Sequence, residues 1–132
     1  MKTFKKVKVC FLLILVFVNI FYVAPCYSSS LREELFQKAL DLSSGGQFNL
    51  ALQEWNRYLD SYPDDAAGYS NRGNVRLVVG DVQGSIDDQN NAISLNPSEI
   101  DPYINRGIAE EALGLWSQAK KDYMFVISQD IE

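Results

Sequence analysis

Histidine is absent from this 132-residue chain, and its only two cysteines, Cys10 and Cys26, lie near the N-terminus. The rest of the chain therefore has no His-paired nucleophile, no thiolate, no disulfide and no zinc site made of His and Cys. It also lacks a phosphate-binding loop, because Gly45-Gly46 has no following Lys-Ser/Thr pair. These absences argue against an enzyme, and we expect no catalytic residue, no metal site and no cofactor.

Carboxylates do occur in adjacent pairs, at Asp64-Asp65, Asp87-Asp88 and Glu110-Glu111. Neighbouring residues on a helix point about 100° apart, so the two members of a pair diverge. We interpret these pairs as solvated charge rather than as an acid–base pair. No loop spaces them as calcium ligands.

Similar residue types recur every 34 residues through the rest of the chain. The clearest ladders are Gly46, Gly80 and Gly114; Phe48, Val82 and Trp116; and Ala51, Ser85 and Ala119. The segment Tyr69–Gly73 (YSNRG) is also rewritten one period later as Tyr103–Gly107 (YINRG). A fixed period of this size indicates one supersecondary unit repeated, because a single unit cannot bury its own apolar face.

Each period contains two helical patterns separated by a glycine. Small residues recur in both patterns, for example Gly73 and Gly107, and would let paired helices approach closely. Ser30 with Glu33 forms a capping box, and Asp101-Pro102 supplies an N-cap followed by proline at the first helical position. The sequence predicts helices over 31–44, 47–61, 66–79, 82–95, 102–113 and 116–129.

The order of an aromatic, a glycine, a small residue and a proline at these offsets resembles the tetratricopeptide repeat (TPR). The resemblance covers residues 32 to 132, with departures at Ser85, Gln89 and Ile131. It implies an all-α, right-handed α-solenoid of three helix-turn-helix repeats, 32–65, 66–99 and 100–132, with six antiparallel helices. The Asn-Arg-Gly text is similar to that of TPR proteins of cyanobacteria and chloroplasts.

The first thirty residues have a different composition. Four lysines precede an apolar run over residues 9–24, which Pro25, Cys26 and three serines follow. This order predicts a secretory signal peptide over residues 1–28, cleaved after Ser28. An uncleaved anchor formed by residues 9–24 and, through Cys26, a lipoprotein remain alternatives.

The part after Ser30 is acidic. The chain has 17 acidic and 12 basic residues, and four of the basic ones lie in the N-terminal segment, so the rest carries a net charge of −9. An acidic surface repels phosphate backbones, and we expect no nucleic-acid partner.

Recognition of another protein remains, and the repeat positions indicate where to look. In TPR arrays the first helices of successive repeats line a concave groove that holds a peptide or a helix. Gln37, Asn71 and Asn105 share one such position, and side-chain amides can pair with a peptide backbone of any sequence. The alternative is that these amides only cap helices or bridge between them.

Further groove positions alternate in polarity along the array. They are Phe36 and Leu40 in the first repeat, Ser70 and Asn74 in the second, and Ile104 and Ile108 in the third. The apolar residues would grip a partner's side chains or else belong to the core.

A basic column, Lys38, Arg72 and Arg106, does not match the peptide-carboxylate clamp of chaperone-binding TPR domains. We interpret the arginines instead as inter-repeat partners for carboxylates. Arg76 and Glu110, one period apart, would pair across the stack.

The sequence thus predicts an exported protein-binding scaffold or assembly factor in the periplasm, in the thylakoid lumen or secreted. The alternative is a membrane-anchored structural adaptor that self-associates. The last predicted helix carries Tyr123–Ile127, more apolar surface than one neighbouring helix covers. We expect that face to be exposed in the monomer and covered by self-association, by a partner or by further sequence.

Overall fold

The computed structural model describes residues 31–129, and every regular element within that range is a helix. The first helix covers residues 31–44. It is followed by α2 (Phe48–Ser61), α3 (Ala66–Val78), α4 (Val82–Leu95), α5 (Asp101–Ala112) and α6 (Trp116–Gln129). These bounds agree with the predicted ones to within one residue, so the all-α prediction is confirmed.

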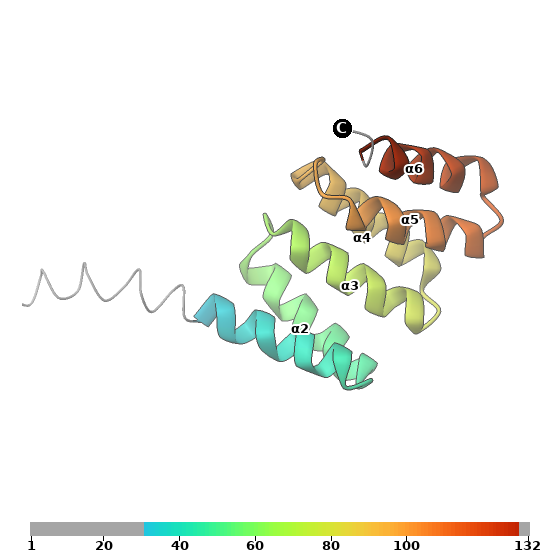
Figure 1. The fold of residues 1–132 in the computed structure, drawn as a ribbon. Helices are drawn as coiled ribbons and strands as arrows, with labels where there is room; N and C mark the ends of the chain where they lie inside the picture. The colour runs from blue at the N-terminus through green and yellow to red at the C-terminus, as the bar shows by residue number, and fades with distance from the viewer. Residues whose placement is uncertain (1–30, 130–132) are drawn as a thin grey trace, which may run out of the picture. The chain divides into compact units, whose positions relative to one another are not determined.

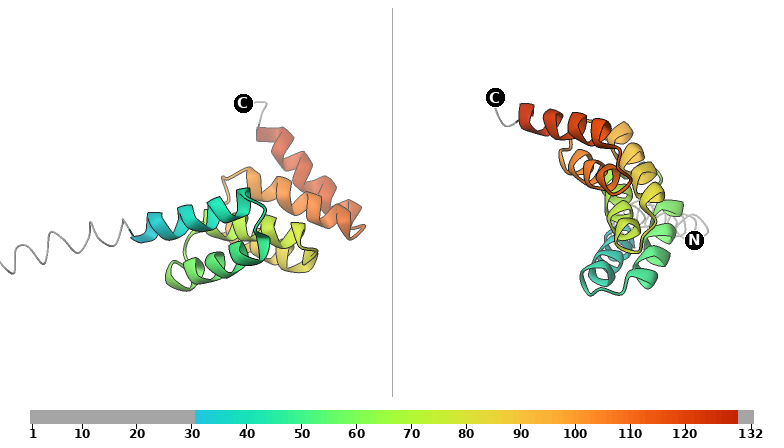
Figure 2. Two further views of the ribbon diagram at one scale, coloured as in Figure 1. Left: turned by 90° about the horizontal axis from the view of Figure 1, so that it is seen from below. Right: turned by 90° about the vertical axis from the view of Figure 1, so that its right-hand side faces the viewer.

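The chain divides into two units, Met1–Glu34 and Leu35–Glu132, and the fold described here is that of the second. Within it, α2 packs on α3, α3 on α4, α4 on α5 and α5 on α6, while α3 also contacts α5 (Figures 1 and 2). The first helices of successive repeats thus form one layer and the second helices another. This arrangement is an α-solenoid of helix pairs.

Glycine ends the first helix of each pair. Gly46, Gly80 and Gly114 have φ angles of 72°, 90° and 72°, a left-handed conformation that side chains with a Cβ rarely adopt. This conformation explains why a glycine separates the two helical patterns of each period.

The helix starts differ in how they are capped. Asp65 and Asp81 cap α3 and α4, because their Oδ1 atoms accept from the N–H of Gly68 and Gly84, each at 3.0 Å. The predicted N-cap at Asp101 is wrong by one residue. The helix α5 begins at Asp101, its N-cap is Ile100, and Pro102 lies in the first turn, where its missing N–H costs no helical bond.

Small residues lie where the paired helices cross. A Cβ built on Gly107 would come 2.5 Å from Cε1 of Tyr123, and one on Gly73 would come 2.7 Å from Nε2 of Gln89. Ala51, Ser85 and Ala119 are also buried. Any larger side chain at the two glycines would overpack the crossing, as the sequence predicted.

The core is aromatic in the first repeat. Trp55 and Tyr58 are almost fully buried, and Phe36 meets them edge to face with ring centroids 5.1 and 5.4 Å away. In the second repeat, by contrast, Gln89, Asp88 and Ser85 are buried. The solenoid therefore changes from an apolar to a polar interior along its length.

A ladder of ion pairs links the two helices of every repeat. Its rungs, spaced 34 residues apart, are Lys38–Glu54, Arg72–Asp88 and Arg106–Asp122. Each N···O distance is 2.7 Å. We call this set the ion-pair ladder.

Several sequence-based predictions lie outside the described residues. They are the signal segment 1–28, the capping residue Ser30 and the departure at Ile131. None of the helices in the described part is long and apolar enough to cross a membrane.

Candidate functional site

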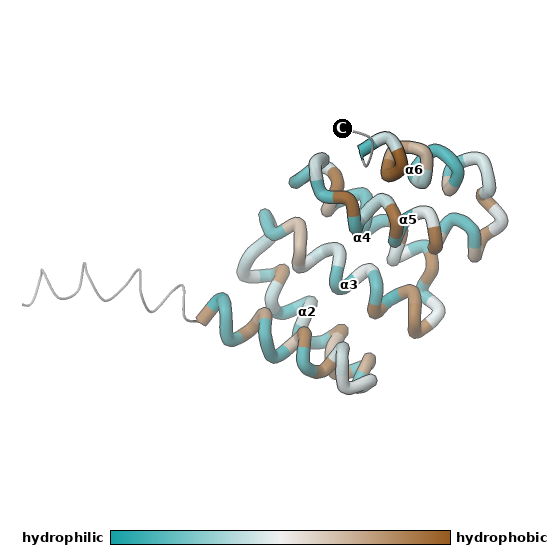
Figure 3. Tube along the Cα trace, in the orientation of Figure 1, coloured by the Kyte–Doolittle hydropathy of each residue, from teal (hydrophilic) through white to brown (hydrophobic). Residues whose placement is uncertain are grey.

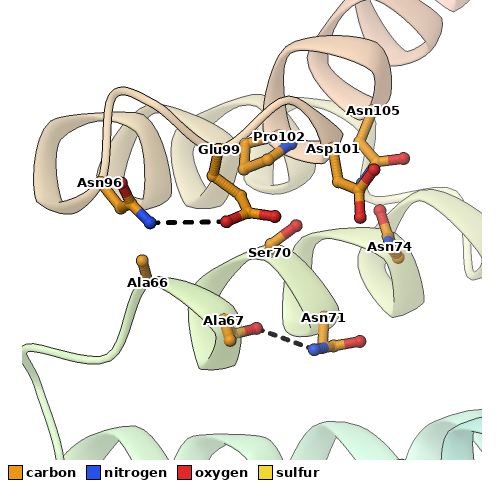
Figure 4. Close-up of a pocket in the computed structure, with 10 residues that line it drawn as sticks. All are labelled: Ala66, Ala67, Ser70, Asn71, Asn74, Asn96, Glu99, Asp101, Pro102 and Asn105. Atoms are coloured by element: carbon orange, nitrogen blue, oxygen red, sulfur yellow. Dashed lines mark hydrogen bonds between the residues drawn. The ribbon is translucent and has the colours of Figure 1, made fainter.

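A pocket of about 230 Å³ opens between α3 and the segment that leads from α4 into α5. One side is formed by residues of α3, and the other by the α4–α5 turn and the first turns of α5 (Figure 4). The lining residues are Ala66, Ala67, Ser70, Asn71, Asn74, Asn96, Glu99, Asp101, Pro102 and Asn105.

Asparagine side chains of α3 are oriented by hydrogen bonds within the fold. The Nδ2 of Asn71 donates to the carbonyl of Ala67 at 2.9 Å, which leaves its Oδ1 as an acceptor (Figure 4). The Oδ1 of Asn74 accepts from Nε2 of Gln89 at 3.2 Å, which leaves its Nδ2 as a donor. The pocket therefore offers fixed polar groups of both kinds.

Gln89 supports the floor of this pocket from behind. Its side chain is fully buried, and its Nε2 also donates to the carbonyl of Ser70 at 3.1 Å. Because that one amide group touches both Ser70 and Asn74, it holds two lining residues in place. Its Oε1 is buried without a hydrogen-bond partner in the described structure.

The opposite side carries the charge. Glu99 and Asp101 are exposed carboxylates, and Asn96 donates to Oε2 of Glu99 over a long 3.4 Å. None of the ten lining residues is basic. The pocket is therefore rich in hydrogen-bond acceptors and negative.

The structure brings together four of the residues predicted to line a groove: Ser70, Asn71, Asn74 and Asn105. Gln37 lies one repeat away, exposed, and donates to Oδ1 of Asp41 at 2.7 Å. Phe36 and Leu40 pack against the core of the first repeat. Ile104 is half-buried and Ile108 is 44% exposed, and neither lines the pocket.

Sequence reasoning missed the half of the pocket contributed by the segment between α4 and α5. Asn96 and Glu99 lie in this connection, and Asp101 and Pro102 lie in the first turn of α5 that follows it. The signal that could have found them is their place directly before the first helix of a repeat or in its first turn. Gln89 departs from the TPR pattern in the sequence, but only the fold shows that it supports the floor.

The arginines of the basic column are engaged away from the pocket. Arg72 donates from Nε and Nη2 to both carboxylate oxygens of Asp88, at 2.9 and 2.7 Å, and from Nη1 to Oδ1 of Asn56 at 2.9 Å. The hydrogen bonds to Asp88 raise the pKa of Arg72, although burial opposes this. Arg106 repeats the pattern with Asp122 and Asn90.

This geometry corrects three predictions. The arginines pair with carboxylates of their own repeat, and the residue that they reach in the preceding repeat is an asparagine. Arg76 pairs with Asp88 and Asp81 rather than with Glu110. Asp88 and Glu110 are only 1% and 8% exposed, so they are not solvated charges. Each is enclosed between packed helices.

No protein-family model matches the chain. Among curated relatives, a FAM10 family protein of Arabidopsis thaliana is 33% identical over 85 residues, 64% of this chain and 19% of that protein. Tetratricopeptide repeat protein 36 of Danio rerio is 27% identical over 106 residues, 72% of this chain and 57% of that protein. The chain spans about a fifth of the length of the Arabidopsis relative.

Solved structures share the fold. The first TPR domain of Spaghetti (RPAP3), bound to the HSP90 peptide SRMEEVD, has a TM-score of 0.71 and 27% identity, and the match covers 74% of this chain and 77% of that one. MamA of Desulfovibrio magneticus has a TM-score of 0.70 and 21% identity, covering 73% and 54%.

The paired helices, the left-handed glycines and the close helix crossings define a helical-repeat protein of the α-solenoid class. The 34-residue period and these likenesses identify the repeat. The chain belongs to the tetratricopeptide repeat family, and the six helices of its described part fit three repeats.

Proposed function

We propose that this protein binds an extended segment of another protein in the groove formed by α3 and α5, and that it acts as a scaffold or assembly factor. The observation that carries the proposal is the gathering of Ser70, Asn71, Asn74 and Asn105 around one pocket. The related TPR domains of Spaghetti are solved with a bound HSP90 peptide, which supports a peptide as the ligand.

The pocket has the chemistry that backbone recognition requires. An extended peptide presents N–H and C=O groups that need partners when water is excluded. The Oδ1 of Asn71 is an available acceptor, and the Nδ2 of Asn74 is an available donor. Contacts of this kind hold a chain irrespective of its side chains.

A binding role rather than catalysis is supported by the side chains at hand. The chain has no histidine, and the pocket has no cysteine. Its two carboxylates, Glu99 and Asp101, are exposed and lack the desolvated setting in which carboxyl groups work as acids.

The groove proposal is tested by Asn71→Ala combined with Asn105→Ala. Each side chain that leaves a partner's backbone group unpaired should cost about 1 kcal/mol or more of binding free energy. Helicity and thermal stability should stay nearly unchanged. Asn91→Ala is the matched control, since Asn91 is an exposed asparagine of α4 outside the pocket. Equal affinity of the double variant and the control for a partner isolated from the native compartment would overturn the proposal.

We further propose that the protein is exported, on the strength of the lysine-rich start and the apolar run over residues 9–24. N-terminal sequencing of the protein from its native host is the test. A first residue of Ser29 supports export with cleavage, whereas an intact Met1 supports a membrane anchor.

A second candidate, a structural adaptor that self-associates, is favoured by α6. Trp116, Met124 and Ile127 are 66%, 60% and 59% exposed, and Figure 3 shows hydrophobic residues concentrated in the second half of this helix. An exposed patch of this kind promotes association. Light scattering at tens of micromolar tests it: a strictly monomeric species that binds no hydrophobic dye would exclude this candidate.

A further inference from the structure

The pocket combines two carboxylates with neutral amides and has no basic side chain in its lining, and this combination selects a ligand chemistry. Glu99 and Asp101 supply two carboxylates, and Oδ1 of Asn71 supplies a third acceptor. The nearest arginines in sequence, Arg72 and Arg106, have their guanidinium groups bound to Asp88 and Asp122. No basic side chain of the lining neutralises this charge.

Helix starts are often anion sites, but several N–H donors at the two that border this pocket are engaged. At the start of α5, Pro102 has no N–H, and the N–H groups of Tyr103 and Ile104 both bond the carbonyl of Ile100, at 3.1 and 3.3 Å. At the start of α3, Asp65 accepts from the N–H groups of Gly68 and Tyr69. An acidic ligand group would therefore meet two carboxylates and no basic side chain of the lining.

The lining residues are held in place by hydrogen bonds from the core. The buried amide of Gln89 reaches Ser70 and Asn74 from behind, so it fixes the floor opposite the two carboxylates. Within the described residues, no group of three His, Cys, Asp or Glu side chains is placed to hold a metal ion. A volume of about 230 Å³ lies below the range usual for small-molecule sites, about 300–1,000 Å³, and suits one long side chain of a larger partner.

We infer that this pocket receives a lysine or arginine side chain of the bound segment, between the carboxylates of Glu99 and Asp101 and the amides of Asn71 and Asn105. This inference rests on the proposed groove. It also separates this chain from the Spaghetti domains, whose bound peptide SRMEEVD has three acidic residues among its last four. The carboxylates set the preference, and the amides hold the backbone on either side of the basic residue.

The test is selection of random heptapeptides on phage against the full chain in mild detergent. We expect the selected peptides to be enriched in lysine or arginine at one position. A synthetic peptide from that set should bind about three- to fivefold more weakly for each carboxylate removed in Asp101→Asn and Glu99→Gln. Asp87→Asn, which removes one exposed charge from α4, should leave affinity unchanged. The peptide SRMEEVD should bind at least tenfold more weakly than the selected one.

The outcomes separate the two proposals. Peptides that bind with no enrichment of basic residues, or whose affinity is the same for Asp101→Asn and Asp87→Asn, would overturn the inference and leave the groove intact. Preferential binding of SRMEEVD would also overturn it. The double variant Asn71→Ala with Asn105→Ala should bind the selected peptides more weakly than the parent does. If no selected peptide shows this loss, the result would count against both the groove and its basic ligand.

Discussion

The second and third repeats carry opposite charges at the same structural position. In the second repeat, Arg76 lies 3.2 Å from the carboxylate of Asp88, which Arg72 also binds at 2.7 Å. One period later, Glu110 takes the place of Arg76, beside the pair of Arg106 and Asp122. Two guanidinium groups thus share one carboxylate in the second repeat, whereas in the third a second carboxylate lies beside a single guanidinium that binds Asp122.

The difference shows that the same backbone position accepts a positive or a negative side chain, and that the negative one in the third repeat lowers stability. The Oε2 of Glu110 is buried without a hydrogen-bond partner. Burial raises the pKa of Glu110, the charge of Asp122 raises it further, and the charges of Arg106 and Lys121 oppose the rise. In the second repeat the buried carboxylate is neutralised by two guanidinium groups. In the third repeat, folding disfavours the charged form of Glu110.

The largest expected effect is the loss of the shared carboxylate in the second repeat. Asp88→Asn leaves Arg72 and Arg76 without their buried partner, and removing one member of a buried pair costs about 3–5 kcal/mol. Asp122→Asn removes the partner of Arg106 but also relieves Glu110, so its cost should be clearly smaller. Urea unfolding of the full chain, followed by circular dichroism, measures both.

Asp87→Asn is the matched control for these variants, because Asp87 is the exposed neighbour of Asp88 on α4. Its free energy of unfolding should stay within about 0.5 kcal/mol of the parent value. Equal losses for Asp88→Asn and Asp122→Asn would contradict the contrast between the two repeats.

The second prediction concerns the glycine at each helix crossing. Gly107→Leu drives a side chain into the ring of Tyr123, and overpacking of this kind costs about 1–3 kcal/mol. Gly73→Leu would displace Gln89 and press on Asp88, which disturbs the ion pairs of Asp88 with Arg72 and Arg76. Its loss of stability should therefore be at least as large as that of Gly107→Leu. Thermal melts of both variants provide the comparison. A Gly107→Leu variant as stable as the parent would mean that the crossing is looser than described.

The sequence predicted the helices and the glycine turns well because each rests on local chemistry repeated at a fixed spacing. Gly80 and Gly114 needed only their period to be recognised as helix ends. The partner of Arg72 was harder, since Asp88 lies 16 residues away on the next helix and only packing selects it. For this reason the prediction that Asp88 is a solvated charge is wrong.

The candidate site was predicted in part for the same reason. Ser70, Asn71 and Asn105 occupy repeated positions and could be found from their spacing. Glu99 belongs to the turn between two repeats and is not part of any residue pattern that recurs every 34 residues. Only the folded structure therefore places it beside α3. Gln89 holds Asn74 in place from inside the core. A polar residue type such as glutamine gives no sign in the sequence that its side chain is buried.

The third prediction uses pH to sharpen the contrast at Glu110. The folded chain holds this proton to a higher pH than the unfolded chain, for which the ordinary value is about 4.5. Its contribution to stability is therefore greatest below that value and falls as the pH rises through the raised folded-state pKa. Glu110→Gln should remove this decline and stabilise the chain at neutral pH by about 1 kcal/mol.

Urea unfolding of the parent and of Glu110→Gln from pH 4.5 to 7.5 tests this prediction. Glu111→Gln is the control, because Glu111 is the exposed neighbour of Glu110 and is not among the charges that shift the pKa of Glu110. The stability difference between Glu110→Gln and the parent should grow with pH, and a constant difference would mean that folding does not raise the pKa of Glu110.

The smallest effect is expected at the first rung of the ion-pair ladder, where lysine replaces arginine. Lys38 reaches Glu54 at 2.7 Å, but its side chain is 53% exposed, against 14% for Arg72 in the equivalent pair. A single ammonium also lacks the two-pronged contact that Arg72 makes with Asp88. Exposed pairs contribute about 0.2–1 kcal/mol, so Lys38→Met should lower the free energy of unfolding by no more than that. Its effect should disappear in 1 M salt, whereas that of Asp88→Asn should persist, because buried charges are screened far less. A loss at Lys38 as large as that at Asp88 would show that the rungs are equivalent and that burial does not grade them.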